Sequence, residues 1–375
     1  MTNFALYEYS TNNIGDDIQS IAARRFLPRV DYFINRDQLS EFPGAPDGSL
    51  TKLVANGWYM HKPYGWPPNL RANLDPLLIS MYIKTSDPHV MEAFFSQQSL
   101  EYFHAYGRPI GVRDLHTLRV LESKGIPAYW SGCLTLTLTA NTAYQRGDFV
   151  LAIDVSDAVY EFLRDNSTKP VWRLTVMIPK DLPQKQRFEL AEYYLYLYQT
   201  AHAIVSSRLH VVLPATAFET PVLLVKERTY NPQRYSGLQD LVRNAYTEEY
   251  LDNFGIFDVN GPTPNPDMYL AKRSQLVHDV ATFTGYDSVA TDLVHTRQFT
   301  PEHLSLQLLQ IIDQTRRDGE RQLAAHKTAS KAARQEQRTR NTLLKQRYDQ
   351  RLAAARDAYE KQKARADQLQ TRRHG

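Results

Sequence analysis

Short apolar runs alternate with segments of helical spacing from the start of the chain to about residue 225. Runs that are apolar throughout are typical of buried parallel strands, and apolar spacing near 3.6 residues is typical of helices. The pattern predicts strands at Leu6–Ser10, Leu53–Trp58, Leu77–Ile83, Pro109–Asp114, Ile126–Tyr129, Phe149–Val155, Val171–Ile178, Ala203–Val205 and Pro221–Val225. It predicts helices at Ile18–Phe26, Leu115–Lys124 and Gln184–Gln199, and it leaves Val211–Ala217 open between helical and extended.

Strands that alternate with helices indicate parallel sheets covered on both faces. Because the alternation occurs twice, we expect an α/β fold of two doubly wound, Rossmann-like domains with a cleft between them. The expected boundaries are residues 1–145 for the first domain and 146–300 for the second. Residues 301–375 differ in character and are expected to form a long, basic helical extension.

The expected extension combines positive charge with a thin apolar seam. From residue 316 onward, 17 Lys or Arg stand against 7 Asp or Glu, so a chain of net charge +3 carries −7 elsewhere. A solvated single helix, self-association through a coiled-coil seam, and attraction to an anionic lipid or polymer all fit this composition. The apolar positions are Leu304, Leu308 and Ile311, followed by Leu344, Tyr348, Leu352, Ala355 and Tyr359.

Composition limits the class of protein. Apolar residues make up 42% of the chain and charged residues 23%, as in ordinary folded proteins. No run of about twenty apolar residues occurs and the N-terminus lacks a signal-peptide pattern, so we expect a cytoplasmic protein whose tail contacts at most the inner face of the membrane. The single cysteine, Cys133, excludes an intrachain disulfide and a cysteine zinc site. Nothing resembles a nucleic-acid-binding module, and no metal-ligand cluster is readable.

The segment Ser206–His210, directly after a predicted strand, carries the most specific chemistry. An arginine binds a carboxylate or phosphate through two parallel hydrogen bonds, and a histidine transfers protons near neutral pH. A core histidine beside a surface arginine is the simpler interpretation of His210 and Arg208. Arg113 ends another predicted strand at a helix N-terminus, where anions bind favourably, although a structural contact with Asp114 would also explain it.

The loop Asn13–Asp17 joins the first predicted strand and helix. In α/β folds such loops lie at the carboxyl ends of strands, where ligands bind. Asn13 and Gly15 can form the turn. We expect Asp16 or Asp17 either to cap the helix or to act as a base toward an acceptor hydroxyl.

Four segments give the chain a resemblance to the polysaccharide pyruvyl transferase family. Their order over about residues 5–245, together with the Ser-Gly-Cys-Leu-Thr block, makes the match fairly specific, and the basic tail lies outside it. The segments are Asn13-Ile14-Gly15-Asp16-Asp17; Asn56-Gly57-Trp58 with Trp66-Pro67-Pro68; Gly111-Val112-Arg113-Asp114 with Ser131-Gly132-Cys133-Leu134-Thr135-Leu136-Thr137-Leu138; and Ser207-Arg208-Leu209-His210 with Pro221.

The resemblance implies two Rossmann-like domains in the GT-B arrangement with the site in the cleft. It implies phosphoenolpyruvate as donor substrate without a bound cofactor, a saccharide or lipid-linked glycan as acceptor, and a pyruvate ketal of a cell-surface or exopolysaccharide as product. We expect His210 to be the acid, Arg208 the donor clamp and Arg113 a second clamp. The complete expected site is, for catalysis, His210, Arg208 and Asp16, and, for substrate binding, Arg113, Leu209, Ser207, Asn13, Gly15 and Asp17.

Two other functions fit the same sequence. A GT-B glycosyltransferase with a nucleotide-sugar donor would share the fold and the cleft, because one fold hosts many functions. A non-catalytic saccharide-binding protein that organises an assembly through its basic tail would share them too. The presence of Arg113, Arg208 and His210 favours an enzyme.

Overall fold

A computed structural model describes residues 2–59, 65–228 and 232–286, together with scattered helical residues between 330 and 350. By its contacts the chain divides into residues 1–303 and residues 304–375, and all the sheets described below lie in the first unit. The apolar seam expected in the basic tail falls outside the described residues. The boundaries expected at residues 145 and 300 stay predictions.

The first half of this unit is built on a four-stranded parallel sheet in the order β2-β1-β3-β5. Two short parallel pairs, β4-β6 and β7-β8, follow, and a bridge between Met81 and Val112 joins them to each other. The elements are β1 Asn3–Glu8, α1 Ile14–Arg24, β2 Tyr32–Asn35, η1 Arg36–Glu41, β3 Thr51–Ala55, β4 Trp58–Tyr59, η2 Leu70–Ala72, β5 Leu74–Leu78, β6 Tyr82–Ile83, α2 Pro88–Phe94, α3 Gln97–Ala105, β7 Ile110–Val112, α4 Leu115–Ser123, β8 Ala128–Trp130 and η3 Leu134–Thr137.

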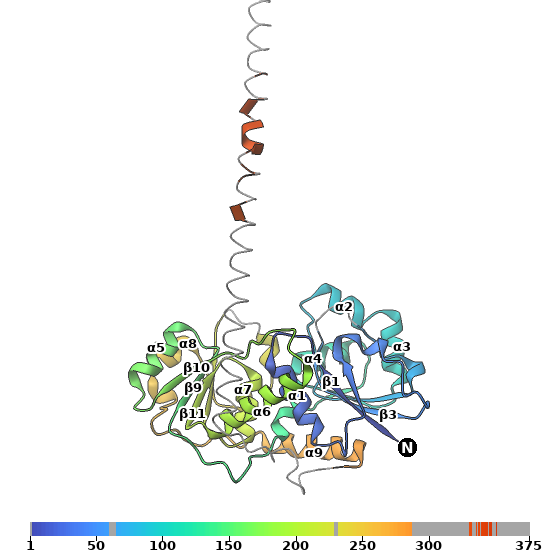
Figure 1. Ribbon diagram of the computed structural model, residues 1–375, viewed down its shortest axis with the longest axis horizontal. Helices are drawn as coiled ribbons and strands as arrows, with labels where there is room; N and C mark the ends of the chain where they lie inside the picture. Colours follow the sequence, from blue (N-terminus) through green and yellow to red (C-terminus); the bar gives the residue numbers. More distant parts are fainter. Residues whose placement is uncertain are drawn as a thin grey trace, which may run out of the picture. The chain divides into compact units, whose positions relative to one another are not determined.

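The second half is built on a five-stranded parallel sheet in the order β10-β9-β11-β12-β13. Figure 1 shows α5 and α8 at the outer side of this sheet, and α6 and α7 on the side toward α1. The elements are β9 Val150–Ile153, α5 Asp157–Asn166, β10 Val171–Leu174, α6 Gln184–Thr200, β11 Ala203–Ser206, α7 Leu209–Ala217, β12 Val222–Lys226, η4 Pro232–Tyr235, η5 Gln239–Leu241, β13 Asn244–Tyr246, α8 Thr247–Asp252, η6 Phe254–Ile256 and α9 Leu270–Thr284.

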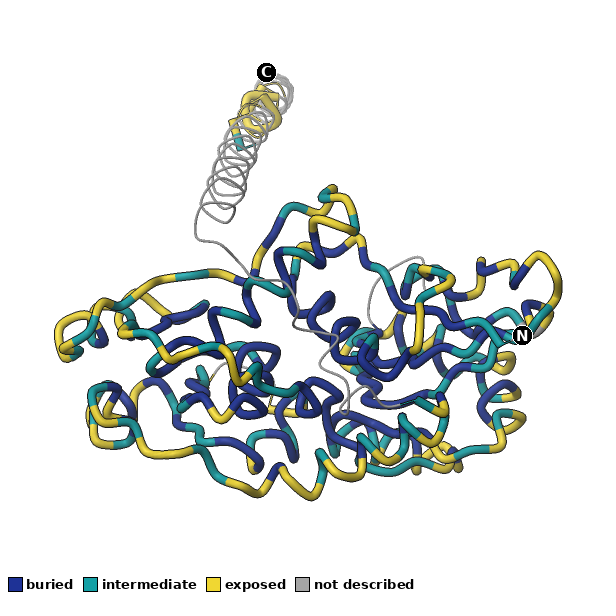
Figure 2. Tube along the Cα trace, turned by 60° about the horizontal axis from the view of Figure 1, so that its bottom comes forward, coloured by how far each residue is buried: buried dark blue, intermediate teal, exposed yellow. Residues whose placement is uncertain are grey.

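The α/β class and the parallel sheets expected from the sequence are confirmed. Figure 2 shows buried positions in the interior of both halves, and each large sheet contributes to its own apolar cluster. Several details of the expectation were wrong. The run Leu53–Trp58 is divided between β3 and β4 rather than forming one strand. The run Leu77–Ile83 is also two strands, because Ser80 takes a left-handed backbone (φ +52°) that interrupts a strand. The cap of α1 is Asn13, whose side chain accepts from Gly15 N, and not Asp16 or Asp17.

The two halves are joined by backbone pairing at the loop before α1. Asn13 bridges to Met177, the amide of Ile14 donates to the carbonyl of Val176 at 3.0 Å, and the amide of Ile178 donates to Asn12 at 2.9 Å. The loop before α1 is therefore fixed against the second half of the chain rather than left free.

A second link runs through α9, which follows the second sheet and contacts the first half. Lys272 Nζ on α9 donates to the Trp130 carbonyl at 2.6 Å, and Tyr129 Oη donates to Asp279 at 2.6 Å. None of the helices in the described ranges combines the length and the apolar character needed to cross a membrane.

Candidate active site

The N-terminus of α1 meets the N-terminus of α7 at Gly15 and His210. A Cβ placed on Gly15 would lie 2.7 Å from Nδ1 and 2.9 Å from Cβ of His210, closer than real Cβ atoms approach. Any larger residue at position 15 would therefore displace the imidazole. This contact brings the first motif of the sequence onto the last one, although nearly 200 residues separate them.

His210 is buried in the first turn of α7, and its Nε2 has no hydrogen-bond partner among the residues that the structure describes. The N-cap residue of α7 is Arg208, whose side chain makes no capping hydrogen bond, whereas Asn13 caps α1 and Ser156 caps α5. The first amides of α7 therefore keep the orientation and partial positive charge that attract an anion.

The charges around His210 disfavour its protonation in the empty protein. Burial, followed by the positive charge of Arg113, lowers the pKa of His210 from 6.5 to about 3. Arg234 and Arg36 act in the same direction, and Asp16 opposes them. The imidazole is therefore neutral at neutral pH, and the expectation that His210 is an acid stays a prediction.

Arg208 is held by a carboxylate that directly follows β9. Its Nε donates to Asp154 Oδ2 at 2.8 Å, and its backbone amide donates to Ser206 Oγ at 3.1 Å. The carbonyl of Asp154 accepts from Ser207 Oγ at 2.7 Å, and Asp154 itself lies in the left-handed region (φ +49°). The side chain of Arg208 is about a quarter exposed. Asp154 holds the guanidinium group through Nε, which leaves its other N–H groups available as donors. Leu209 is buried behind it.

Arg113 is a fully buried guanidinium without a polar partner. None of Nε, Nη1 and Nη2 has a hydrogen bond to any residue within the described ranges, and the group lies 4.6 Å above the ring of Tyr82. The neighbouring carboxylate of Asp114 instead caps α4, accepting from the amide and hydroxyl of Thr117 at 2.8 and 3.0 Å. The structural Arg–Asp contact that the sequence left open is therefore not formed.

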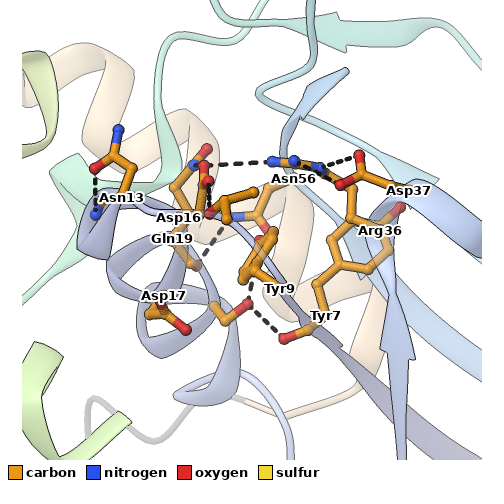
Figure 3. A network of polar contacts seen from close by, with 12 residues as sticks. Tyr7, Tyr9, Asn13, Asp16, Asp17, Gln19, Arg36, Asp37 and Asn56 are labelled. Atoms are coloured by element: carbon orange, nitrogen blue, oxygen red, sulfur yellow. Dashed lines mark hydrogen bonds and ion pairs between the residues drawn. The ribbon is translucent and has the colours of Figure 1, made fainter. Parts of the chain in front are cut away.

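Asp16 belongs to a buried network shown in Figure 3. Its carboxylate accepts from Thr11 Oγ1 at 2.6 Å and Gln19 Nε2 at 3.4 Å, and it forms an ion pair with Arg36 Nη1 at 3.3 Å. Arg36 also donates to both oxygens of Asp37, at 3.1 and 3.2 Å, and lies 5.0 Å from the ring centre of Tyr9. The network holds Asp16 beside His210, and Arg36 partly offsets the negative charge of Asp16.

Asp17, one residue on, points the other way. Arg187 of α6 binds both of its oxygens, at 3.1 and 2.7 Å, and both side chains are almost completely buried. Gln184 adds a contact at 3.3 Å. The contacts of Asp17 describe an anchor between α1 and α6, so the substrate-binding role expected for it stays a prediction without support from its contacts.

The structure thus gathers Gly15, Asp16, Arg113, Arg208 and His210 at one place. Sequence reasoning missed three further charged groups there, namely Arg36, Asp154 and Arg234. Asp154 could have been found, because it follows a buried strand directly, as Arg208 nearly does. Arg36 directly follows β2, a strand that the sequence analysis did not predict, and Arg234 lies in η4, a short helix that it did not predict either.

These features define an α/β protein with a cluster of buried, mainly positive side chains near the N-termini of α1 and α7, between two parallel sheets. Comparison with known proteins gives the family. The model of the polysaccharide pyruvyl transferase family matches residues 13–227, more than half of the chain. The chain belongs to this family, which is one of transferases. Among curated proteins no match was found.

Proposed function

We propose that the protein transfers the enolpyruvyl group of phosphoenolpyruvate to a saccharide and closes it to a pyruvate ketal. The single observation that carries this proposal is the guanidinium of Arg113, fully buried and without a polar partner in the described part of the chain. A buried, unpaired charge is so unfavourable that an anionic ligand is the natural partner for it. The two parallel sheets on either side of the site support a GT-B arrangement as part of the same proposal.

The donor matches the charges at the site. Phosphoenolpyruvate has an anionic carboxylate at one end and a phosphate at the other. In the proposed complex Arg113 binds the carboxylate, while Arg208 and the first amides of α7 bind the phosphate. Asp154 orients the guanidinium of Arg208 for this contact.

His210 supplies the proton that the reaction needs at carbon. The acceptor hydroxyl adds to the enol carbon that bears the phosphate, and the methylene carbon takes a proton from His210 to become a methyl group. Asp16 takes the hydroxyl proton. A second hydroxyl then attacks the same carbon, the bond to the phosphate oxygen breaks, and the second proton leaves with the phosphate as hydrogen phosphate.

Donor binding and proton transfer are coupled through charge. Burial and the positive charge of Arg113 hold the pKa of His210 at about 3 in the empty protein. An anionic donor between these groups offsets the charge of Arg113, raises the pKa of the imidazole, and so lets His210 act as an acid in the complex.

The direct test is mass spectrometry of candidate glycans after incubation with phosphoenolpyruvate, with released phosphate measured in parallel. A mass gain of pyruvate minus water, with one phosphate released per ketal, is expected. Protection from thermal unfolding by phosphoenolpyruvate, compared with a panel of nucleotide-sugars, tests the donor independently of the acceptor. Protection by a nucleotide-sugar alone would replace the proposal with a glycosyltransferase.

The role of His210 predicts the behaviour of one variant. His210→Ala should reduce kcat by about 100-fold or more, as expected for a lost general acid, and should still be protected by the donor. His278→Ala, which removes an exposed histidine on α9, is the control and should have wild-type turnover. Wild-type turnover in His210→Ala would remove His210 from the mechanism.

A further inference from the structure

Two aromatic rings contact each other beside the site. Trp58 and Tyr82 are cross-strand partners on β4 and β6, and their ring centres lie 5.7 Å apart at an angle of 67°. We refer to Trp58 and Tyr82 as the ring pair. Because the two strands are bonded in register, the two rings hold a fixed spacing.

Each ring carries one guanidinium from a different segment of the chain. Arg113, at the end of β7, lies 4.6 Å from the ring centre of Tyr82. Arg234, in η4, lies 4.5 Å from the ring centre of Trp58. A ring face attracts a cation but supplies no counter-charge, so the ring pair positions two positive groups without neutralising either.

The arginines in this region fall into two groups, those with a carboxylate partner and those without one among the described residues. Arg208 is paired with Asp154, and Arg36 is paired with Asp16 and Asp37. Arg113 and Arg234 make no ion pair with any carboxylate in the described ranges, and Nε of Arg234 is buried without a hydrogen bond. Burial, together with the charges of Arg113 and Arg208, lowers the pKa of Arg234, as expected for like charges held close together.

Two unpaired guanidinium groups on adjacent rings repel each other unless an anion lies between them. We propose that Arg234 is a further donor-binding residue, which contacts the phosphate of the donor while the Trp58 ring holds its guanidinium in place. This inference rests on the proposed function and extends it, because Arg234 lies outside the residues matched by the family model, 13–227.

In this proposal Arg234 contacts the phosphate and not the carboxylate of the donor. The groups around Arg234 favour the phosphate because it is the more highly charged end of the donor. Arg113 and Arg208 both act on the pKa of Arg234, and Arg208 is the N-cap residue of α7, whose first amides attract anions. Tyr235, the next residue, donates its hydroxyl to the Ser207 carbonyl at 3.3 Å and so ties η4 to the start of α7. Arg234 therefore sits with the phosphate-binding groups, and Arg113 remains for the carboxylate.

The test compares wild type with Arg234→Gln in turnover of phosphoenolpyruvate, with inorganic phosphate and pyruvate as separate inhibitors. For Arg234→Gln, kcat/KM for the donor should fall about 10- to 100-fold, the range for a lost hydrogen bond to a charged group. The inhibition constant for phosphate should rise by a similar factor, and that for pyruvate should stay unchanged. Arg234→Lys should be intermediate, because it keeps the charge but loses the planar stack on Trp58.

Arg228→Gln is the matched control. Arg228 lies shortly before η4, is largely exposed and pairs with Glu248 and Glu249 at 3.7 and 3.6 Å, so its loss should leave donor kinetics unchanged. Unchanged kinetics and phosphate inhibition in Arg234→Gln would overturn this inference and leave the proposed function standing. Equal weakening of phosphate and pyruvate would also overturn it, since that indicates a collapsed site. A wild type that neither turns over nor is protected by phosphoenolpyruvate would overturn both.

Discussion

At the scale of the residue, the protein keeps an arginine where folding alone would disfavour it. Arg113 is as deeply buried as Arg36 and Arg187, but those two have carboxylate partners and Arg113 has none in the described ranges. The contact with the ring of Tyr82 offsets only about 2 kcal/mol of the cost of burying this charge. Removing a charge from water costs several kcal/mol, so the site stores an unfavourable energy that an anionic ligand can relieve.

This balance predicts that Arg113→Met makes the free protein more stable. The free energy of unfolding should rise by about 1 kcal/mol or more, because an apolar side chain of similar length replaces an unpaired buried charge. Urea unfolding measures it, and protection by phosphoenolpyruvate should disappear in the same variant. Arg187→Met, which leaves Asp17 buried without its partner, is the opposite control and should lose about 3–5 kcal/mol. A loss of stability in Arg113→Met would mean that this guanidinium has a structural partner.

Residue types placed after buried strands made Arg113, Arg208 and His210 candidates, and only the resemblance to the family favoured them as site residues over a structural role. The charged groups that surround these residues could not be predicted in the same way. The lowered pKa of His210 depends first on burial and then on the charges of Arg113, Arg234 and Arg36, which come from segments far away in the chain. Pairing over such distances is set by the tertiary fold, and a single sequence carries no local pattern for it.

At the scale of the element, the contact between α1 and α7 decides the position of His210. Gly15 is required by close approach and not by backbone conformation, because its Cα faces the imidazole directly. Helix α7 is buried along its whole length, so it shows no apolar stripe. This explains why the sequence left Val211–Ala217 undecided between helix and strand.

The contact predicts a specific defect for Gly15→Ala. The added methyl would lie 2.7 Å from His210 Nδ1, so the imidazole must move, and overpacking of this kind costs about 1–3 kcal/mol of stability. We expect kcat to fall by about 10-fold or more while the KM for the donor changes little, since a small displacement of a catalytic group affects the chemical step. Gly261→Ala is the control, because its nearest neighbour, Asp258, would lie 3.9 Å from the new Cβ. Wild-type kcat in Gly15→Ala would show that His210 can move without loss of function.

At the scale of the whole molecule, two buried groups near α1 give stability opposite dependences on pH. Burial raises the pKa of Asp17 from 3.8 to about 6, even though Arg187 opposes the shift. The native state therefore binds more protons there, and this group favours folding as pH falls below about 6. His210 acts in the other direction, because its native pKa of about 3 lies below the unfolded value of 6.5. Between these values the unfolded state binds more protons, so stability falls as pH falls.

Because the two contributions oppose each other, the pH dependence of wild type alone does not separate them, but the difference from a His210 variant does. In His210→Gln the contribution of Asp17 remains and that of His210 is gone. The variant should gain stability relative to wild type as pH falls from about 7 to about 5, by up to about 1.4 kcal/mol per pH unit. Urea unfolding of both proteins across this range measures the gain. Parallel curves would mean that His210 takes up a proton in the native protein as readily as in the unfolded chain, and that the arginines around it do not hold the imidazole neutral before the donor binds.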